Sequence, residues 1–261
     1  MKPQTGRYCA EGRMSWIDWE RIGFKQIETA KAQVVLTDGL EASARRARYQ
    51  IFNQFIDAYN AKYFLLAHTL NDQAENVLLG LARGSGTRSL SGMAAQNNKF
   101  VRPLLKISRA TTHAACIEGG VEIWEDPHNS DQRFTRVRVR QNILPIIEEN
   151  LGPKIIEALA RSSDLLRDDA DALDSFANEF FDQVDKLNLE VNDLVRLPKA
   201  IRTRVLRLAI YNAGAPAGSL SAEHISGVES LISEWHGQKE VALPGNVKVF
   251  RNSGRIILSN Q

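Results

Sequence analysis

The sequence predicts an α/β fold in which a parallel sheet with helices is followed by a mainly helical domain that ends in a β-hairpin. Before residue 141, short apolar runs alternate with helical patterns, and this order is typical of parallel sheets with short connections. From Gln141 onward only helical patterns follow, until two short apolar runs close the chain. We therefore expect a first domain over residues 1–145 and a second over residues 146–261.

The central strand and helix of the first domain surround His68. Residues 63–67 form an unbroken apolar run, short enough for a strand that is buried on both faces. Asn71 or Asp72 can cap the helix that follows, and Gly84 can end it. His68 is therefore expected at the carboxyl end of a parallel strand, where open α/β sheets bind their ligands.

The other elements follow from apolar spacing, caps and breakers. In chain order we expect a weak strand at 33–37, a helix at 41–59, a strand near 100–101, a helix capped by Ser108 and ended by Gly119-Gly120, helices at 153–184, 198–212 and 221–235, the last capped by Ser221, and a hairpin from 241–243 and 247–250 with Gly254 in a following turn.

Composition excludes several classes of protein. Of the 261 residues, 43% are hydrophobic, an ordinary value for a globular protein. No apolar run approaches the ~20 residues that span a membrane and no signal peptide heads the chain, so we expect a cytoplasmic protein without membrane contact. Cys9 and Cys116 are the only cysteines and form no Cys-x-x-Cys pair, so we expect neither disulfides nor a protein-bound metal. A net charge of +2 does not by itself indicate a nucleic-acid partner.

Two carboxylates follow His68 at helical spacing. Asp72 and Glu75 are three residues apart, so both lie on one face of the first helical turn. Carboxylates at this position stabilise a helix through its dipole whatever the function. A histidine at a strand end can be a core residue that bonds a backbone carbonyl. On these residues alone, the structural interpretations are favoured over a site.

Several motifs together resemble those of the tRNA(Ile)-lysidine synthetases, members of the PP-loop ATP pyrophosphatase superfamily. They cover about residues 20 to 261 in the family's order and spacing. In this chain they are Glu41–Tyr49, Ala67–Glu75, Arg83-Gly84-Ser85-Gly86, Gly92-Met93, Arg102–Leu105, Trp124–Asn129 and Arg136–Arg140. The resemblance implies a PP-loop, adenine nucleotide alpha hydrolase-like first domain and tRNA recognition by the second.

The resemblance also implies an ATP-dependent ligase that acts in two steps. ATP, accompanied by Mg²⁺, adenylates the C2 oxygen of the wobble cytidine in the CAU anticodon of tRNA(Ile). The amine of L-lysine then displaces AMP to give lysidine, which decodes AUA instead of AUG. The residues implied are Asp72, Glu75 and Arg48 for catalysis; Arg45, Arg48, His68, Arg83, Gly84 and Gly86 for ATP; Asp72 and Glu75 for lysine; and Arg133, Arg136, Arg138 and Arg140 for tRNA.

The basic residues have structural alternatives. Arg45 and Arg48, in the helix expected at 41–59, could simply be solvent-exposed residues on one face of that helix. The glycines after Arg83 form either a helix C-cap or a mobile phosphate-binding loop, with equal weight. The dense positive cluster at residues 133–140 suits RNA phosphates, but its arginines could equally pair with Asp126 or Asp131.

One family motif is absent from the sequence. Family members begin with a strand and an S-G-G-x-D-S loop whose amides hold the ATP phosphates, and no such sequence occurs in these 261 residues. Truncation is the first hypothesis, and we expect the chain as given neither to bind ATP tightly nor to make lysidine. Two alternatives stay open: a non-catalytic tRNA-binding fragment, and another PP-loop tRNA-modifying enzyme such as a thiolase, several of which need paired cysteines. The sequence does not indicate an oligomeric state.

Overall fold

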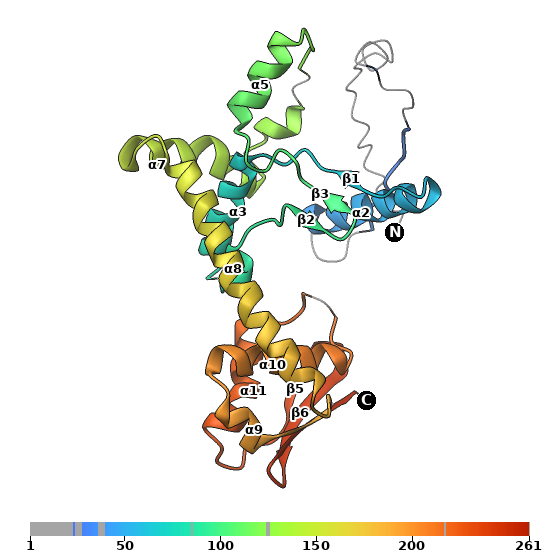
Figure 1. Ribbon diagram of the computed structural model, residues 1–261, viewed down its shortest axis with the longest axis vertical. Coiled ribbons are helices and arrows are strands. Elements are labelled where there is room, and N and C mark those ends of the chain that lie inside the picture. The colour runs from blue at the N-terminus through green and yellow to red at the C-terminus, as the bar shows by residue number, and fades with distance from the viewer. Residues whose placement is uncertain are drawn as a thin grey trace. The chain divides into compact units, whose positions relative to one another are not determined.

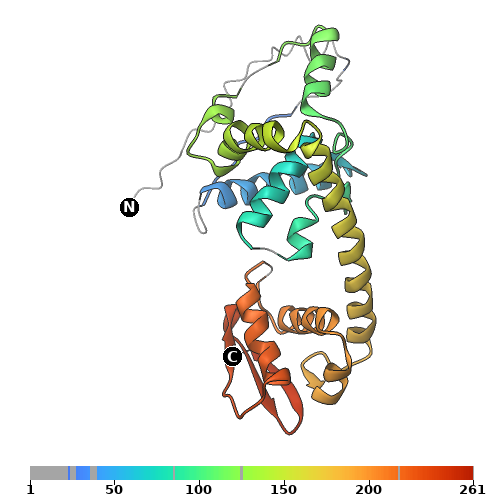
Figure 2. The same cartoon turned by 90° about the vertical axis from the view of Figure 1, so that its left-hand side faces the viewer.

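The computed structural model describes residues 23, 28–35, 40–84, 86–123, 126–216 and 218–260. Contacts divide the chain into two compact units, the first formed by residues 1–84 and 90–163, the second by residues 85–89 and 164–261. Helix α8 (Ile155–Asp182) begins in the first unit and continues in the second (Figures 1 and 2). The domain boundary at residues 145/146 stays a prediction.

The first unit contains a small mixed sheet with α2 (Leu40–Ala58) packed on it. Its strands run in the order β1-β3-β2, with β1 parallel and β2 antiparallel to β3. Aromatic rings join helix and sheet, since Phe52 stacks on Phe64 with centroids 4.5 Å apart and Tyr49 meets Phe100 edge-on at 5.1 Å. The strands are β1 (Phe64–Leu65), β2 (Gln96–Asn97) and β3 (Phe100–Val101).

Two expectations about strands are wrong. The apolar run at 63–67 is not buried on both faces, because Leu65 is 65% exposed. Successive side chains of a strand point to opposite faces, so Phe64 meets the aromatic rings of α2 while Leu65 points away from them. Residues 33–35 lie in no strand, and Val35 is exposed because nothing in the described part of the chain pairs with it. The remaining positions of that expected strand, 36–37, lie outside the described residues.

Helix α3 (Leu70–Ala82) follows β1, as the sequence predicts, but its cap is a different residue. Thr69 is the N-cap, and both its backbone N and its Oγ1 donate to Asp72 Oδ2, at 2.7 and 2.8 Å. The expectation that Asn71 or Asp72 caps the helix is therefore wrong, because the extended residue of the capping box precedes them. Gly84, at φ +62°, follows the last turn as expected.

The rest of the first unit is helical. Ser108 caps α5, accepting a hydrogen bond from Thr111 N at 3.0 Å, and Gly119-Gly120 ends it, both as predicted. The arginine run that could be a strand or a helix is helical, and its second half is a π-helical turn. The elements are α5 (Arg109–Glu118), η1 (Pro127–Ser130), α6 (Thr135–Arg138), η2 (Val139–Ile143) and α7 (Leu144–Leu151).

The second unit is a helical layer packed on a four-stranded antiparallel sheet with the order β4-β7-β6-β5. The expected helices, the cap at Ser221 and the hairpin are confirmed. Strands β4 and β7 were not expected from the sequence. The elements are α4 (Thr87–Leu90), β4 (Asn188–Glu190), α9 (Val191–Arg196), α10 (Lys199–Asn212), α11 (Ala222–Ser233), β5 (Val241–Leu243), η3 (Pro244–Asn246), β6 (Val247–Asn252) and β7 (Arg255–Asn260).

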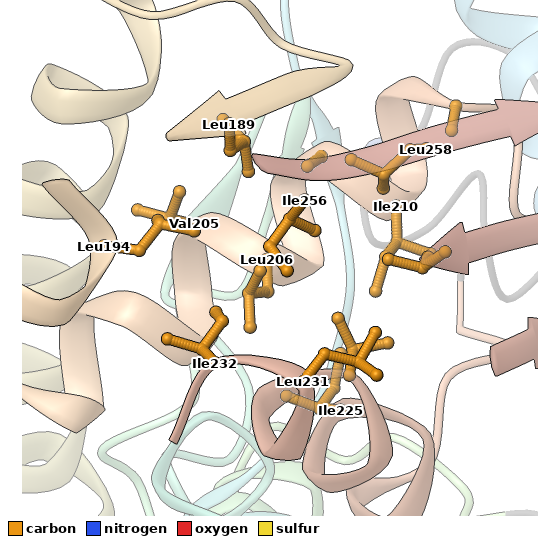
Figure 3. Packing of buried hydrophobic residues seen from close by; sticks show 14 of the residues in the cluster. Leu189, Leu194, Val205, Leu206, Ile210, Ile225, Leu231, Ile232, Ile256 and Leu258 are labelled. Carbon is orange, nitrogen blue, oxygen red and sulfur yellow. The ribbon is translucent and has the colours of Figure 1, made fainter. Parts of the chain in front are cut away.

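A single apolar core holds these elements of the second unit together (Figure 3). Leu206 and Ile210 of α10 and Leu231 of α11 are fully buried against Ile256 of β7. Burying each such side chain contributes about 1.5–3 kcal/mol. None of the helices that the structure describes is long and apolar enough to cross a membrane.

Candidate active site

Glu75 is the centre of a charge cluster in the first unit. Its side chain is fully buried, and α3 places it one turn after Asp72 on the same face. Arg140 binds it with two hydrogen bonds, from Nε to Oε1 at 2.7 Å and from Nη2 to Oε2 at 3.1 Å. Arg109 Nη2 donates to Oε1 at 3.3 Å, and Arg136 Nε lies 3.9 Å from Oε2. A buried carboxylate needs partners of this kind to remain charged.

Asp72 shares two of these arginines. Arg109 Nη2 donates to its Oδ1 at 3.1 Å, and Arg140 Nη2 lies 3.6 Å from the same oxygen. Burial by itself would raise the pKa of Asp72, but the two hydrogen bonds from Thr69 and the charges of Arg109 and Arg140 outweigh it and lower the pKa below its ordinary value. Asp72 is therefore ionised at neutral pH and is a weak base.

The cluster carries more positive than negative charge. Three guanidinium groups face two carboxylates, which leaves one formal positive charge. Arg136 and Arg140 are four residues apart on α6 and η2, so helical geometry brings both to one side. Arg136 is also held by the side-chain oxygen of Asn76. Such an excess of positive charge suits an anion, and the carboxylates suit a cation.

Arg109 was not expected from the sequence, although it contacts both carboxylates. Two hydrogen bonds hold the starts of α3 and α5 together: Leu70 N donates to Ile107 O at 2.9 Å, and Arg109 N donates to Asn71 Oδ1 at 2.8 Å. Asn71 thus positions the backbone of Arg109. No local signal reveals this contact, because the partners lie more than 30 residues apart.

The four arginines implied for tRNA separate into two pairs. Arg136 and Arg140 contact the carboxylates, as described above. Arg133 is 87% exposed and binds Asp131, whose pKa its hydrogen bonds lower to about 2. Arg138 is an exposed residue whose guanidinium donates to Gln132 O at 2.7 Å, Arg133 O at 3.1 Å and Thr135 Oγ1 at 3.0 Å. The pairing of Arg133 with Asp131 matches one structural alternative, whereas the binding of Arg136 and Arg140 to Glu75 was not foreseen.

His68 lies beside the cluster at the end of β1. Burial lowers its pKa; the charge of Asp72 opposes this, and Arg102, Arg45 and Arg136 lower the pKa further. The imidazole is therefore neutral at neutral pH, and its Nδ1 is buried without a hydrogen-bond partner among the described residues. An unpaired buried nitrogen is uncommon and is available to a ligand.

The remaining implied ATP residues are exposed. Arg45 packs over the ring of Tyr49 at 4.8 Å, and Arg48 lies on the same helix without burial. Arg83 is the C-cap residue of α3, and Gly84 and Gly86 have open space where a side chain would begin. The structure thus leaves this backbone accessible, and its contact with phosphate stays a prediction.

Gln73 accounts for the Gly92-Met93 motif. Its side-chain amide donates to Met93 O at 2.8 Å and accepts from Met93 N at 2.7 Å. Gly92 has φ +60°, and a Cβ there would lie 2.6 Å from Gln73 Oε1. Only glycine lets the loop approach this closely. The motif that contains Gln73 and the Gly92-Met93 motif are therefore held together by these hydrogen bonds.

Comparisons with known proteins agree with this arrangement. The PP-loop domain family matches residues 18–147, and the TilS substrate binding domain family matches residues 189–256. The tRNA(Ile)-lysidine synthase of Thermobifida fusca is 48% identical over 240 residues, covering 91% of this chain and 74% of the relative. That of Streptomyces coelicolor is 45% identical over 242 residues, covering 91% and 69%.

The chain belongs to the tRNA(Ile)-lysidine synthase family. The resemblance stated from the motifs is therefore confirmed, as is the α/β fold. The tRNA(Ile)-lysidine synthases are ligases that use ATP through their PP-loop domain and bind tRNA, and the chain carries both of the family's domain types.

Proposed function

We propose that this chain, when it is joined to an S-G-G-x-D-S phosphate-binding segment, uses ATP to attach L-lysine to C2 of cytidine 34 in the CAU anticodon of tRNA(Ile) and so gives lysidine. The observation that carries the proposal is the Asp72–Glu75 pair, buried at a strand end and surrounded by three arginines. One cluster thereby offers anionic oxygens for the cationic amino acid and cationic nitrogens for phosphates. A bacterial tRNA is modified in the cytoplasm, which is the location we propose.

The first step forms a bond between the C2 oxygen of cytidine and the α-phosphorus of ATP, and pyrophosphate leaves. Negative charge on the phosphates is stabilised by preorganised cations. We assign this role to Arg45 and Arg48, with neutral His68 as a hydrogen-bond partner and the backbone at Arg83, Gly84 and Gly86 near the phosphates. Their exposure and the unpaired His68 nitrogen support the assignment.

Magnesium would arrive with the ATP phosphates. Within the described ranges no three His, Cys, Asp or Glu side chains gather in a way that could hold a metal ion, and Asp72 and Glu75 are already bound by arginines. Protein carboxylates of this cluster therefore do not fit as magnesium ligands.

In the second step the amine of lysine attacks C2, a C–N bond forms, the C2–O bond breaks, and AMP leaves with the electron pair. The ε-amine releases its protons to solvent water. Asp72 is ionised and weakly basic, so its proposed role is to hold and aim the lysine rather than to remove a proton. Holding the amine against the activated carbon converts a bimolecular step into a local one.

Contacts to tRNA are proposed for Arg133, whose side chain is open to solvent, for Arg138, an exposed residue, and for Arg136 and Arg140 beside the reacting groups. Exposed arginines bind RNA phosphates and release counterions. The anticodon bases themselves would be read as unstacked bases.

An isotope assay tests the proposal. The 261-residue chain is assayed alone and after fusion to the S-G-G-x-D-S segment of a relative, with ATP, labelled lysine, and either CAU-anticodon tRNA or the same tRNA with U at position 34. We expect product only from the fused chain and only with C34. Turnover by the unfused chain would contradict the expectation that it is inactive. Binding of tRNA without product in both forms would favour the non-catalytic alternative.

A further inference from the structure

The arginines of the cluster are held to very different degrees. Arg140 binds Glu75 through two nitrogens at 2.7 and 3.1 Å, and its side chain is 23% exposed. Arg109 uses the single nitrogen Nη2, at 3.1 Å from Asp72 and 3.3 Å from Glu75, and is 36% exposed. Bidentate pairs are the stronger ones, so Arg109 is the more easily displaced.

Arg109 Nη2 lies between the carboxylates of Asp72 and Glu75 and donates a hydrogen bond to each of them. The other oxygens have partners of their own: Asp72 Oδ2 accepts two hydrogen bonds from Thr69, and Glu75 Oε2 accepts one from Arg140. Asp72 Oδ1 has no further hydrogen bond within the described residues, since Arg140 Nη2 is 3.6 Å away. Removal of Arg109 Nη2 therefore opens a position between Oδ1 and Oε1.

The charge of the cluster favours a ligand cation that replaces the Arg109 guanidinium and disfavours one that binds in addition to it. With Arg109 in place the cluster has one excess positive charge. An ammonium group added beside Arg109 would raise the excess to two and would meet a like charge at close range. An ammonium group that replaces the guanidinium leaves the excess unchanged. A cation therefore binds here by exchange.

We propose that Arg109 Nη2 occupies the place of the substrate ammonium, that L-lysine binds by displacing it, and that the released guanidinium then binds the carboxylate of the same lysine. The backbone of Arg109 stays fixed by its bond to Asn71 Oδ1, so only the side chain swings and its reach is limited to the mouth of the cluster. A guanidinium that leaves two carboxylates binds best to another carboxylate. Arg109 thereby selects an amino acid over a simple diamine. The inference rests on the proposed function, which places lysine at Asp72 and Glu75.

Equilibrium dialysis of the 261-residue chain against labelled L-lysine and labelled 1,5-diaminopentane, which lacks the carboxylate, tests the inference. We expect the unaltered chain to prefer lysine. The diamine should bind the Arg109→Ala variant more tightly than it binds the unaltered chain, because the Arg109 guanidinium no longer competes for the two carboxylates. The preference for lysine should fall by about ten- to a hundredfold, the range of one lost charge-assisted hydrogen bond. Arg109→Lys should keep part of the preference, and Arg196→Ala, an exposed arginine of α9, should keep all of it.

The outcomes separate the two proposals. If Arg109→Ala weakens lysine and diamine by the same factor, Arg109 only supports the carboxylates and the inference is wrong. If Arg109→Ala changes neither, the inference is wrong as well. Asp72→Asn should abolish binding of both ligands; if it does not, or if the unaltered chain binds neither, the lysine site itself is wrongly placed. Thermal unfolding of each variant, and Arg109→Gln as a second polar variant, separate loss of the site from loss of the fold.

Discussion

The two units bury charge in different ways. In the second unit Arg202 and Glu229 form one pair, with side chains 12% and 7% exposed. Glu229 also accepts from Ser233 Oγ at 2.9 Å, and Arg202 donates to Leu197 O at 3.2 Å. The pair is charge-balanced and fully bonded. The cluster around Glu75 has three cations for two anions and stays partly open to solvent. A balanced, closed pair is a structural feature, whereas an unbalanced, open one can exchange a partner for a substrate.

The apolar clusters of the two units also differ, in how many buried residues they contain. The second unit has one extended cluster that joins its helices to its sheet (Figure 3). In the first unit, the apolar cluster beside the charges consists of Ala74, Val139 and Leu144 with a few partly buried neighbours. Apolar burial is the main favourable term in folding, and among the described residues the charge cluster of the first unit has fewer buried apolar neighbours than the core of the second unit contains.

The largest expected effect comes from Glu75→Gln. Removing one partner of a buried ion cluster costs about 3–5 kcal/mol of unfolding free energy, and the rise from one excess positive charge to two should also abolish lysine binding. Glu229→Gln is the matched control: we expect a similar loss of stability without any effect on lysine binding. Urea unfolding and equilibrium dialysis measure the two quantities. Equal effects of both variants on lysine binding would remove the distinction between the units.

Leu206→Ala should lower the unfolding free energy by about 2–5 kcal/mol, because it leaves a cavity in the core of the second unit. Leu165→Ala on the exposed face of α8 should change it by less than about 0.5 kcal/mol. Urea unfolding checks both. A small effect of Leu206→Ala would mean that this core is not the main source of stability.

Arg133→Ala and Arg138→Ala should each weaken tRNA binding and reduce the slope of log affinity against log salt by about one unit, slightly less on single-stranded RNA. Arg140→Ala should weaken tRNA binding and also lower the melting temperature, because Glu75 loses its bidentate partner. Filter binding at several salt concentrations and thermal unfolding measure both quantities for each variant. An unchanged salt slope in Arg133→Ala and Arg138→Ala would leave them without an RNA role.

The smallest expected effect is on pH dependence. The pKa of His68 is below its unfolded value of 6.5, so the unfolded chain binds the proton more readily and stability falls as the pH drops below about 6.5. His68→Gln should flatten this decline, which can reach at most about 1.4 kcal/mol per pH unit for one group. The pKa of Asp72 is also lowered, and its contribution is lost only as the pH falls below about 3.8. Asp72→Asn should keep the decline that begins near pH 6.5 and extend it to lower pH, because the charge of Asp72 opposes the lowering of the His68 pKa, and melting curves across pH 3–8 distinguish the two windows.

Local signals in the sequence determined most helices and their ends. The caps at Ser108 and Ser221 and the glycine stops at Gly84 and Gly119-Gly120 depend on residues a few positions apart. The family motifs also implied that Asp72 and Glu75 lie near the sites for ATP and lysine. By contrast, β7 reads as a plain apolar segment, and only its antiparallel neighbours β4 and β6 make it a central strand.

The composition of the charge cluster was decided by the tertiary structure. The structural alternative offered by the sequence was pairing of Arg136 and Arg140 with Asp126 or Asp131, which are close along the chain, whereas the folded chain brings these arginines to Glu75, 61 and 65 residues away. Arg109 entered the cluster in the same way, through the alignment of two helix starts. Caps and stops depend on local backbone geometry, so they can be predicted from neighbouring residues. Which charges meet depends on how helices far apart in sequence pack, and pairing rules for charges are too unspecific to choose among thirty-three basic and thirty-one acidic residues.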